Sequence, residues 1–133
     1  MKDLYLTSTF KNAWNLEFNP KISNALSTKG FDCHFPKKVE KEEEYMPAFL
    51  ADIEGIKISK CLFAIAENET PNWGAEVGYA YALGKPVIAL AKNGHEIPLV
   101  CNGMVTEIVQ VADLNKIEDY IDHLADVLNK YIK

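Results

Sequence analysis

Residues 70–90 read TPNWGAEVGYAYALGKPVIAL, and this stretch decides the fold. A polar loop that contains Pro71 leads into a helix rich in alanine and other small residues, and Gly84 ends that helix. Pro86 then opens an apolar run that is typical of a buried strand. The stretch therefore predicts one helix and one strand of an α/β protein.

Glu76 is the unusual residue of this stretch. It lies among small and apolar neighbours in what we expect to be the first turn of the helix, where the helix dipole favours an ionised carboxylate. A partly enclosed carboxylate at the mouth of an α/β sheet is a candidate nucleophile. A glutamate that only complements the helix dipole fits the same pattern, so the stretch by itself leaves both interpretations open.

The length and composition indicate one soluble globular domain. The chain has 133 residues, 48% of them hydrophobic and 25% charged, and we expect a single domain over residues 1–133. A formal net charge of -5 argues against binding a nucleic acid polymer, because that affinity comes mainly from neutralised phosphates. A single mononucleotide needs only a local site for one phosphate and stays open.

The sequence predicts a cytoplasmic protein without a metal or other cofactor. It has neither a signal-peptide pattern at the N-terminus nor an apolar stretch long enough to span a membrane. Cys33, Cys61 and Cys101 are widely spaced and form no CxxC pair, which is typical of free thiols in a reducing compartment. The three histidines are equally scattered and give no metal-ligand spacing.

Strand and helix patterns alternate along the chain. We expect strands at residues 4–9, 31–35, 61–66, 87–91 and 108–111, the second of them at an edge. Besides the helix after residue 70, we expect helices from Asn19-Pro20 to Gly30, around Pro47 to Ile56, from Pro98 to Met104, and from Asn115, where Glu118 completes a capping-box pattern. Residues 11–18 fit an early helical turn or an irregular loop. The charged run from Lys37 to Glu44 is typical of a solvated loop, with a substrate lid as the alternative.

This alternation predicts an α/β fold with a flavodoxin-like, doubly wound sheet. The sheet has five parallel strands in the order 2-1-3-4-5 and helices on both faces, which makes three α/β/α layers. Such sheets bind ligands just beyond the carboxyl ends of their strands. Ser8 and Thr9 end the first strand, so their hydroxyls are well placed for a small polar ligand.

Asp52 is a second carboxylate in an unexpected place. Phe49, Ile53 and Ile56 form the apolar stripe of their helix, and Asp52 shares that side. A local hydrogen bond near the helix start explains it as well as a functional role does. Neighbouring strand ends would bring Asp52 close to Tyr5 and Glu76, and two carboxylates in different environments suit glycosidic chemistry.

At these residues the sequence resembles the nucleoside 2-deoxyribosyltransferase family. The resemblance covers most of the chain and rests on Tyr5-Leu6, on DIEGIK at 52–57, on GAEVGYA at 74–80 with GKP at 84–86, and on NGM at 102–104. The most specific part is Glu-x-Gly-Tyr-Ala-x-x-x-Gly-Lys, which starts at Glu76. The dinucleotide-binding and P-loop signatures, by which many other α/β proteins bind nucleotides, are missing from the sequence.

The resemblance implies a role for each matching residue. Glu76 corresponds to the nucleophile that attacks the anomeric carbon and forms a glycosyl-enzyme, and Asp52 to the carboxyl group that handles the proton of the base. Tyr5 corresponds to the hydroxyl that positions the nucleophile. Asn102 corresponds to a residue that a neighbouring subunit lends to the 5′ end of the sugar, which implies a homo-oligomer with shared active sites.

Three further residues are expected at the substrate. Gly74 and Met104 belong to the matching segments, and we expect both to contact the substrate. Trp73 stacks on the base in one interpretation and is a buried core residue in the other.

The sequence departs from the transferases at Thr70. The transferases have an aspartate six residues before the nucleophile, which binds the 5′-hydroxyl. The related nucleoside 5′-monophosphate N-glycosidases place a small hydroxyl residue there and at the position of Thr9 to hold phosphate, and Lys11 would add a charge. Ser8 also replaces the glycine that the family commonly has after the first strand.

The leading hypothesis is an enzyme that cleaves the N-glycosidic bond of a nucleoside and transfers the sugar to a free nucleobase. The alternative is a nucleoside 5′-monophosphate N-glycosidase, in which water replaces the second base. A non-catalytic nucleotide-binding domain is the third hypothesis.

Overall fold

The parallel sheet predicted from the sequence is present, with the predicted strand order. In the computed structural model, which describes residues 2–36 and 39–132, five parallel strands lie in the order β2-β1-β3-β4-β5. The strands are β1 (Lys2–Thr7), β2 (Cys33–His34), β3 (Ser59–Ile65), β4 (Val87–Lys92) and β5 (Glu107–Val111). The helices are α1 (Ala13–Thr28), α2 (Tyr45–Ile58), α3 (Pro71–Ala82), α4 (Leu99–Met104) and α5 (Ile121–Ile132), with single 3₁₀ turns at Glu42–Glu44 and Ile117–Asp119.

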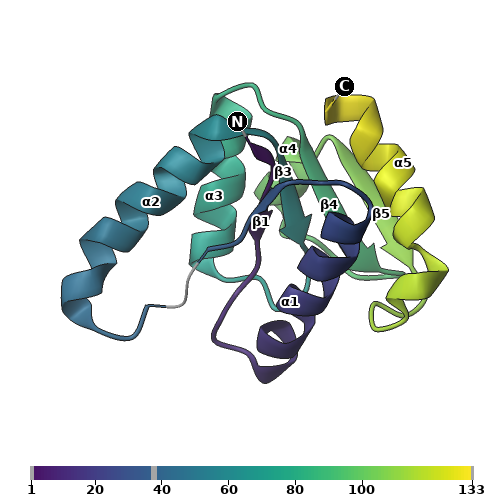
Figure 1. Ribbon diagram of the computed structural model, residues 1–133, viewed down its shortest axis with the longest axis horizontal. Helices are drawn as coiled ribbons and strands as arrows, with labels where there is room; N and C mark the ends of the chain where they lie inside the picture. The colour runs from purple at the N-terminus through teal and green to yellow at the C-terminus, as the bar shows by residue number, and fades with distance from the viewer. Residues whose placement is uncertain (1, 37–38, 133) are drawn as a thin grey trace.

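Helices cover both faces of the sheet, which gives the three layers. Figure 1 shows α1 and α5 together on one side of the strands and α2 and α3 on the other. Two separate clusters of buried side chains fill the two interfaces. The chain leaves β1 toward β2 and leaves β3 toward β4, so β1 and β3 are the neighbouring strands at which the winding direction changes.

Side chains along β1 alternate between the two faces. Leu4 and Leu6 belong to the cluster beneath α1 and α5, whereas Tyr5 belongs to the cluster beneath α2 and α3. Because the side-chain period of a strand is two, Thr7 lies on the same face as Tyr5. Two hydroxyl-bearing side chains of β1 therefore face the layer that contains α2 and α3.

The start of α1 differs from the sequence prediction. The sequence predicts a start at Asn19-Pro20, but the helix begins at Ala13, and the side chain of Asn12 caps it by accepting from the Trp14 N–H at 2.9 Å. Pro20 lies inside the helix on its exposed side, where water can hydrate the carbonyl that loses its N–H donor. Of the two interpretations left open for residues 11–18, the helical one is confirmed from Ala13 onward.

Two other helix positions need correction. The expected capping box at Asn115 does not form: α5 begins at Ile121, and the Asn115 side chain instead accepts a hydrogen bond from the Trp14 indole at 3.0 Å. Glu76 is not in the first turn of α3, which holds no acidic residue. The helix dipole acts mainly within the first turn, so it does not explain this carboxylate.

The side of α2 that carries Asp52 is only partly core. Ile56 is 1% exposed, but Phe49 is 54% exposed, so the apolar stripe predicted for this helix does not pack inward along its whole length. In the charged segment before α2, Lys37 and Lys38 lie outside the described residues, and Glu42–Glu44 form an exposed 3₁₀ turn. Within residues 2–36 and 39–132, none of the helices combines the length and the apolar character that crossing a membrane requires.

Replacing Asn12 with alanine tests the observed start of α1. The variant loses the cap of an otherwise unpaired N–H, so its free energy of unfolding is expected to fall by about 1 kcal/mol. Urea denaturation measures the difference, and Asn12→Asp, which keeps a capping oxygen, is the matched control. Equal stability of Asn12→Ala and the wild type would contradict the cap.

Candidate active site

A cavity opens at the carboxyl edge of the sheet, beside the point where the winding direction changes. Its volume is about 650 Å³. Three segments supply most of its wall: the end of β1 with the loop that follows it, the side of α2 that carries Phe49 and Asp52, and the first turns of α3. Ligands of doubly wound sheets bind at this place, so the cavity is the candidate active site.

Glu76 lies in the cavity wall and is held by two hydroxyl groups from β1. The Tyr5 hydroxyl donates a short hydrogen bond to Glu76 Oε2, and Thr7 Oγ1 donates to Oε1 at 2.7 Å. Tyr5 is fully buried and Thr7 is 1% exposed, so neither donor is free to move away. The two bonds fix the orientation of the carboxylate relative to the sheet.

Burial has the largest effect on the pKa of Glu76. Desolvation raises the pKa of Glu76, and the nearby charge of Asp52 raises it further, while the hydrogen bonds from Tyr5 and Thr7 act in the opposite direction. Desolvation, followed by the charge of Glu76, raises the pKa of Tyr5, so its hydroxyl keeps its proton. Tyr5 is therefore a stable hydrogen-bond donor to Glu76.

Asp52 lines the same cavity from α2. Burial raises the pKa of its carboxyl group, and the charge of His34 and a hydrogen bond from Tyr5 oppose that rise. The raised pKa favours a carboxyl group that carries a proton at higher pH than an ordinary aspartate does. The site thus combines one carboxylate held by two donors with a second carboxyl group in a different environment.

His34 and Gly55 pack against the ring of Tyr5. The His34 ring stacks on the Tyr5 ring at 5.1 Å between centroids, with 11° between their planes. A Cβ at Gly55 would lie 2.9 Å from the His34 ring and 3.0 Å from the Tyr5 ring. Only glycine lets α2 approach these rings so closely, and this approach places Asp52 near Tyr5.

Three hydroxyls line the cavity where the loops after β1 and β3 meet. Ser8 Oγ accepts from Asn15 Nδ2 at 3.0 Å, Thr9 Oγ1 from the Lys11 N–H at 3.1 Å, and Thr70 Oγ1 from the Trp73 N–H at 3.3 Å. Each oxygen thus already accepts a hydrogen bond from the protein, which leaves its O–H as a donor. Lys11 lines the same cavity, and Thr70 caps α3. This end of the cavity suits a ligand group rich in oxygen acceptors.

The other residues singled out in the sequence lie at or beyond the cavity edge. Trp73 is 2% exposed and belongs to the buried cluster beneath α2 and α3, so it is chiefly a core residue, although it also lines the cavity. Gly74 faces Cys101 between α3 and α4, and Met104 packs near Gly78 of α3. Asn102 is exposed on α4 and is not part of the cavity wall.

Sequence reasoning missed Thr7, His34 and Gly55. Strand alternation from Tyr5 predicts the side of Thr7, but not that a helix glutamate lies within reach. His34 becomes informative only through the pairing of β2 with β1, which sets it beside Tyr5. Among the residues that the structure describes, no group of three or more histidine, cysteine, aspartate or glutamate side chains is arranged to hold a metal ion.

A carboxylate held by two donors beside a second carboxyl group, in a cavity at this edge of the sheet, fits an enzyme that acts on a glycosidic bond. Comparison with known families gives the same class. The chain belongs to the nucleoside 2-deoxyribosyltransferase family, whose profile matches residues 4–119. A comparison with curated proteins finds no match.

Solved structures include similar proteins. A 2-deoxyribosyltransferase from Bacillus psychrosaccharolyticus is 26% identical, with a TM-score of 0.72 over 92% of this chain and 95% of that one. A conserved protein from Enterococcus faecalis V583 is 19% identical, with a TM-score of 0.76 over 98% of each chain. The CMP N-glycosidase BcmB from Clostridium botulinum is 16% identical, with a TM-score of 0.69 over 91% of this chain and 99% of that one. The last two likenesses concern the fold.

Burial of Glu76 predicts a pH-dependent stability difference. A carboxyl group whose pKa rises on folding stabilises the folded state below its unfolded pKa and loses that contribution as the pH rises through its folded pKa. Glutamine cannot ionise, so Glu76→Gln is expected to gain stability relative to the wild type as the pH increases from about 4 to about 8. Thermal unfolding of both proteins across this range measures the gain.

Glu107 provides a control of opposite sign for this experiment. Hydrogen bonds from Tyr131 and Lys130 lower its pKa, so Glu107→Gln is expected to lose stability relative to the wild type as the pH rises to about 4, and the difference is expected to stay constant from about 5 to about 8. A stability difference for Glu76→Gln that stays constant with pH would contradict the raised pKa of Glu76.

Proposed function

We propose that this protein cleaves the N-glycosidic bond of a 2′-deoxynucleoside through a covalent intermediate and transfers the sugar to another nucleobase. The observation that carries the proposal is the Glu76 carboxylate, held by Tyr5 and Thr7 at the wall of the cavity. A Glu76 oxygen attacks C1′ of the sugar while the bond from C1′ to the base nitrogen breaks. Its electron pair leaves with the base.

Asp52 manages the proton in this reaction. Its raised pKa favours the protonated form, which donates to the departing base. The ionised Asp52 then accepts a proton from the incoming base as that base attacks C1′ and releases Glu76. Tyr5 keeps its own proton and orients Glu76 through the hydrogen bond that its hydroxyl donates.

A specific observation favours a second candidate, a nucleoside 5′-monophosphate N-glycosidase. Ser8, Thr9 and Thr70 each have an O–H left to donate, and Lys11 adds a positive charge beside them. A phosphate matches this set better than a single 5′-hydroxyl does, because it offers several charged acceptor oxygens. The start of α3 at Thr70 adds the favourable end of a helix dipole. In this candidate, water takes the place of the second base.

We further propose that the protein is a homo-oligomer in which α4 contributes to a neighbouring site. Within one chain, Asn102 is not part of the cavity wall. It shares its short helix with Leu99 and Val100, which are 86% and 70% exposed. Apolar side chains exposed to this degree next to a polar one are typical of a surface that another subunit covers.

Base exchange distinguishes the two enzyme candidates. A transferase incubated with a deoxynucleoside and a different free base is expected to form the new deoxynucleoside, whereas the glycosidase is expected to release base from a deoxynucleoside 5′-monophosphate without a second base. Chromatography follows both reactions. Glu76→Gln is expected to lower either activity by at least about a thousandfold. Failure of both reactions over a broad panel of bases would leave the non-catalytic nucleotide-binding domain as the better hypothesis.

Thr70→Asp is the matched variant for the 5′ end of the substrate. Aspartate preserves the helix cap but repels phosphate, so the ratio of activity on the monophosphate to activity on the nucleoside is expected to fall at least about tenfold. An unchanged ratio would show that Thr70 does not contact the 5′ end.

Mixing two inactive variants tests whether subunits share sites. Asn102→Ala and Glu76→Gln are each expected to be impaired, and a mixture allowed to exchange subunits is expected to regain part of the activity, because some sites then combine an intact Glu76 with an intact Asn102. Size-exclusion chromatography with light scattering gives the oligomeric state of each sample. A mixture no more active than the mean of its components would count against shared sites.

A further inference from the structure

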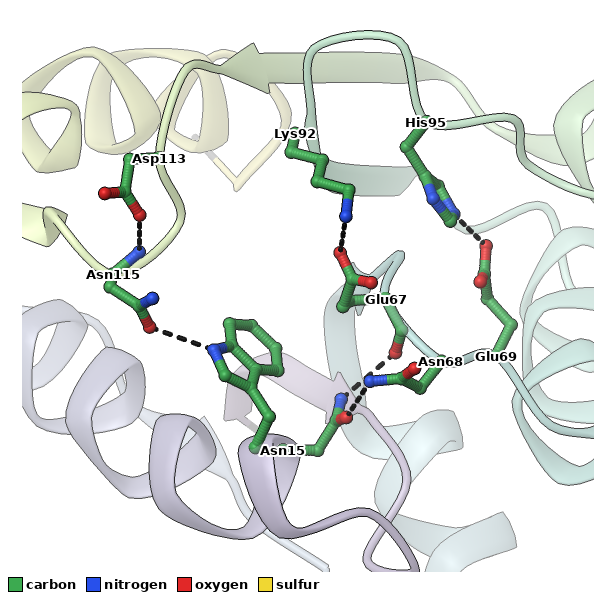
Figure 2. A network of polar contacts seen from close by, with 9 residues as sticks. Asn15, Glu67, Asn68, Glu69, Lys92, His95, Asp113 and Asn115 are labelled. Atoms are coloured by element: carbon green, nitrogen blue, oxygen red, sulfur yellow. Dashed lines mark hydrogen bonds and ion pairs between the residues drawn. The ribbon is translucent and has the colours of Figure 1, made fainter.

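The loop between β3 and α3, residues 66–70, is held from two sides by polar side chains. Figure 2 shows this network, with Asn15 of α1 on one side and, on the other, Lys92 at the end of β4 and His95 in the loop after it. The loop leads directly to Thr70, which caps α3 and lines the cavity. Its conformation therefore sets where one wall of the cavity lies.

Asn15 connects this loop to the loop after β1. The side chain is completely buried, and its Nδ2 donates both to Ser8 Oγ at 3.0 Å and to the Glu67 carbonyl at 3.1 Å. Its Oδ1 accepts from Asn68 Nδ2 at 2.9 Å. One buried amide thus ties together two loops that both contribute hydroxyls to the cavity.

The hydrogen bond between Asn68 and Asn15 matters because the backbone at Asn68 has an unfavourable conformation. Asn68 has a φ of 56°, and within residues 2–36 and 39–132 it is the one non-glycine residue with a positive φ. This left-handed conformation costs about 1 kcal/mol for a residue with a side chain and persists only where the surroundings stabilise it. The hydrogen bond to Asn15 supplies such support.

On its other side, the loop is held by a contact between Glu69 and His95. His95 Nε2 lies 2.7 Å from Glu69 Oε2, and the two side chains are only 17% and 11% exposed. A pair shielded to this degree holds its partners more firmly than an open surface pair does. Lys92 adds a weaker contact to Glu67 at 3.6 Å. The residue next to Thr70 is therefore anchored to the segment that leads from β4 to α4.

We propose that Asn15 and the Glu69–His95 pair are positioning residues for the sugar end of the substrate. They hold the loops after β1 and β3 in one mutual arrangement, so that the hydroxyls of Ser8 and Thr70 meet the 5′ group of the ligand together. None of the three lines the cavity, so each acts through a neighbour. The proposal rests on the function proposed above, because that function places the 5′ end of the ligand at these hydroxyls.

Positioning predicts an effect on substrate binding rather than on chemistry. Glu76, Tyr5 and Thr7 do not belong to the network, so bond cleavage stays intact once the substrate is bound. Glu69→Ala and Asn15→Leu are expected to raise KM for the preferred substrate about tenfold and to change kcat by less than about threefold. Glu69→Gln, which keeps a hydrogen bond to His95, is expected to stay within about twofold of the wild-type KM.

Tyr120→Phe is the control for a general loss of stability. It removes a buried hydrogen bond of 2.6 Å to the Leu114 carbonyl, outside both loops, and is expected to leave KM unchanged. Hydrogen exchange of the amides in residues 66–70 adds a readout that needs no turnover: exchange is expected to speed up in Glu69→Ala and not in Tyr120→Phe. Should Asn15→Leu not fold, Glu69→Ala and its Glu69→Gln partner carry the test.

The outcomes separate this proposal from the proposed function. An active wild type with unchanged KM in Glu69→Ala, or with a loss confined to kcat, would overturn the positioning role alone. A wild type that binds a deoxynucleoside or its monophosphate but turns over neither, with or without a free base, would overturn the proposed activity, and calorimetric affinity would then replace KM in the same comparison. A wild type that neither binds nor reacts would overturn both.

Discussion

The contact between a glutamate on a helix and two hydroxyls on a strand is the constraint on which the rest of the site depends. Glu76 belongs to α3, and its partners Tyr5 and Thr7 belong to β1, which is far away in the sequence. The contact exists only when β1 pairs with β3 in the observed register and α3 returns along the sheet. Burial makes this carboxylate costly, and the two donors offset part of that cost.

The cavity has two ends with different physical characters. Around Glu76 and Asp52, the walls bring carboxyl groups into a partly desolvated place where their pKa values rise. Around Ser8, Thr9 and Thr70, hydroxyl donors and the start of a helix favour an oxygen-rich or anionic group. In the proposed reaction the first end breaks the bond to the base, and the second end holds the sugar.

Patterns in the sequence predict the sheet well because buried strands and small-residue helices are local signals. Strand order follows from the alternation of elements, and the apolar run at 61–66 corresponds to β3 at the centre of the sheet. Helix starts are less predictable, because Asn12, Asn19 and Asn115 are all acceptable caps and only tertiary packing selects among them. In α1 the longer helix buries both Asn15 and Phe18, and that packing outweighs the proline signal.

The candidate site is predictable only in part, for a related reason. Glu76 and Asp52 stand out in the sequence because carboxylates are rare among apolar neighbours. Thr7 and His34 do not stand out, because their importance arises from strand register and from a stack on Tyr5.

The residues that hold the Glu76 carboxylate are buried, whereas other residues of the cavity wall are exposed, and this difference affects which positions tolerate substitution. Tyr5 and Thr7 are almost fully buried, so their replacement disturbs both the core and the carboxylate. Lys11 and Asn72 line the cavity from less buried positions, where replacement costs little stability. Side chains that would contact a ligand can therefore change at little cost in stability, whereas any change at Tyr5 or Thr7 affects the position of Glu76 and the core together.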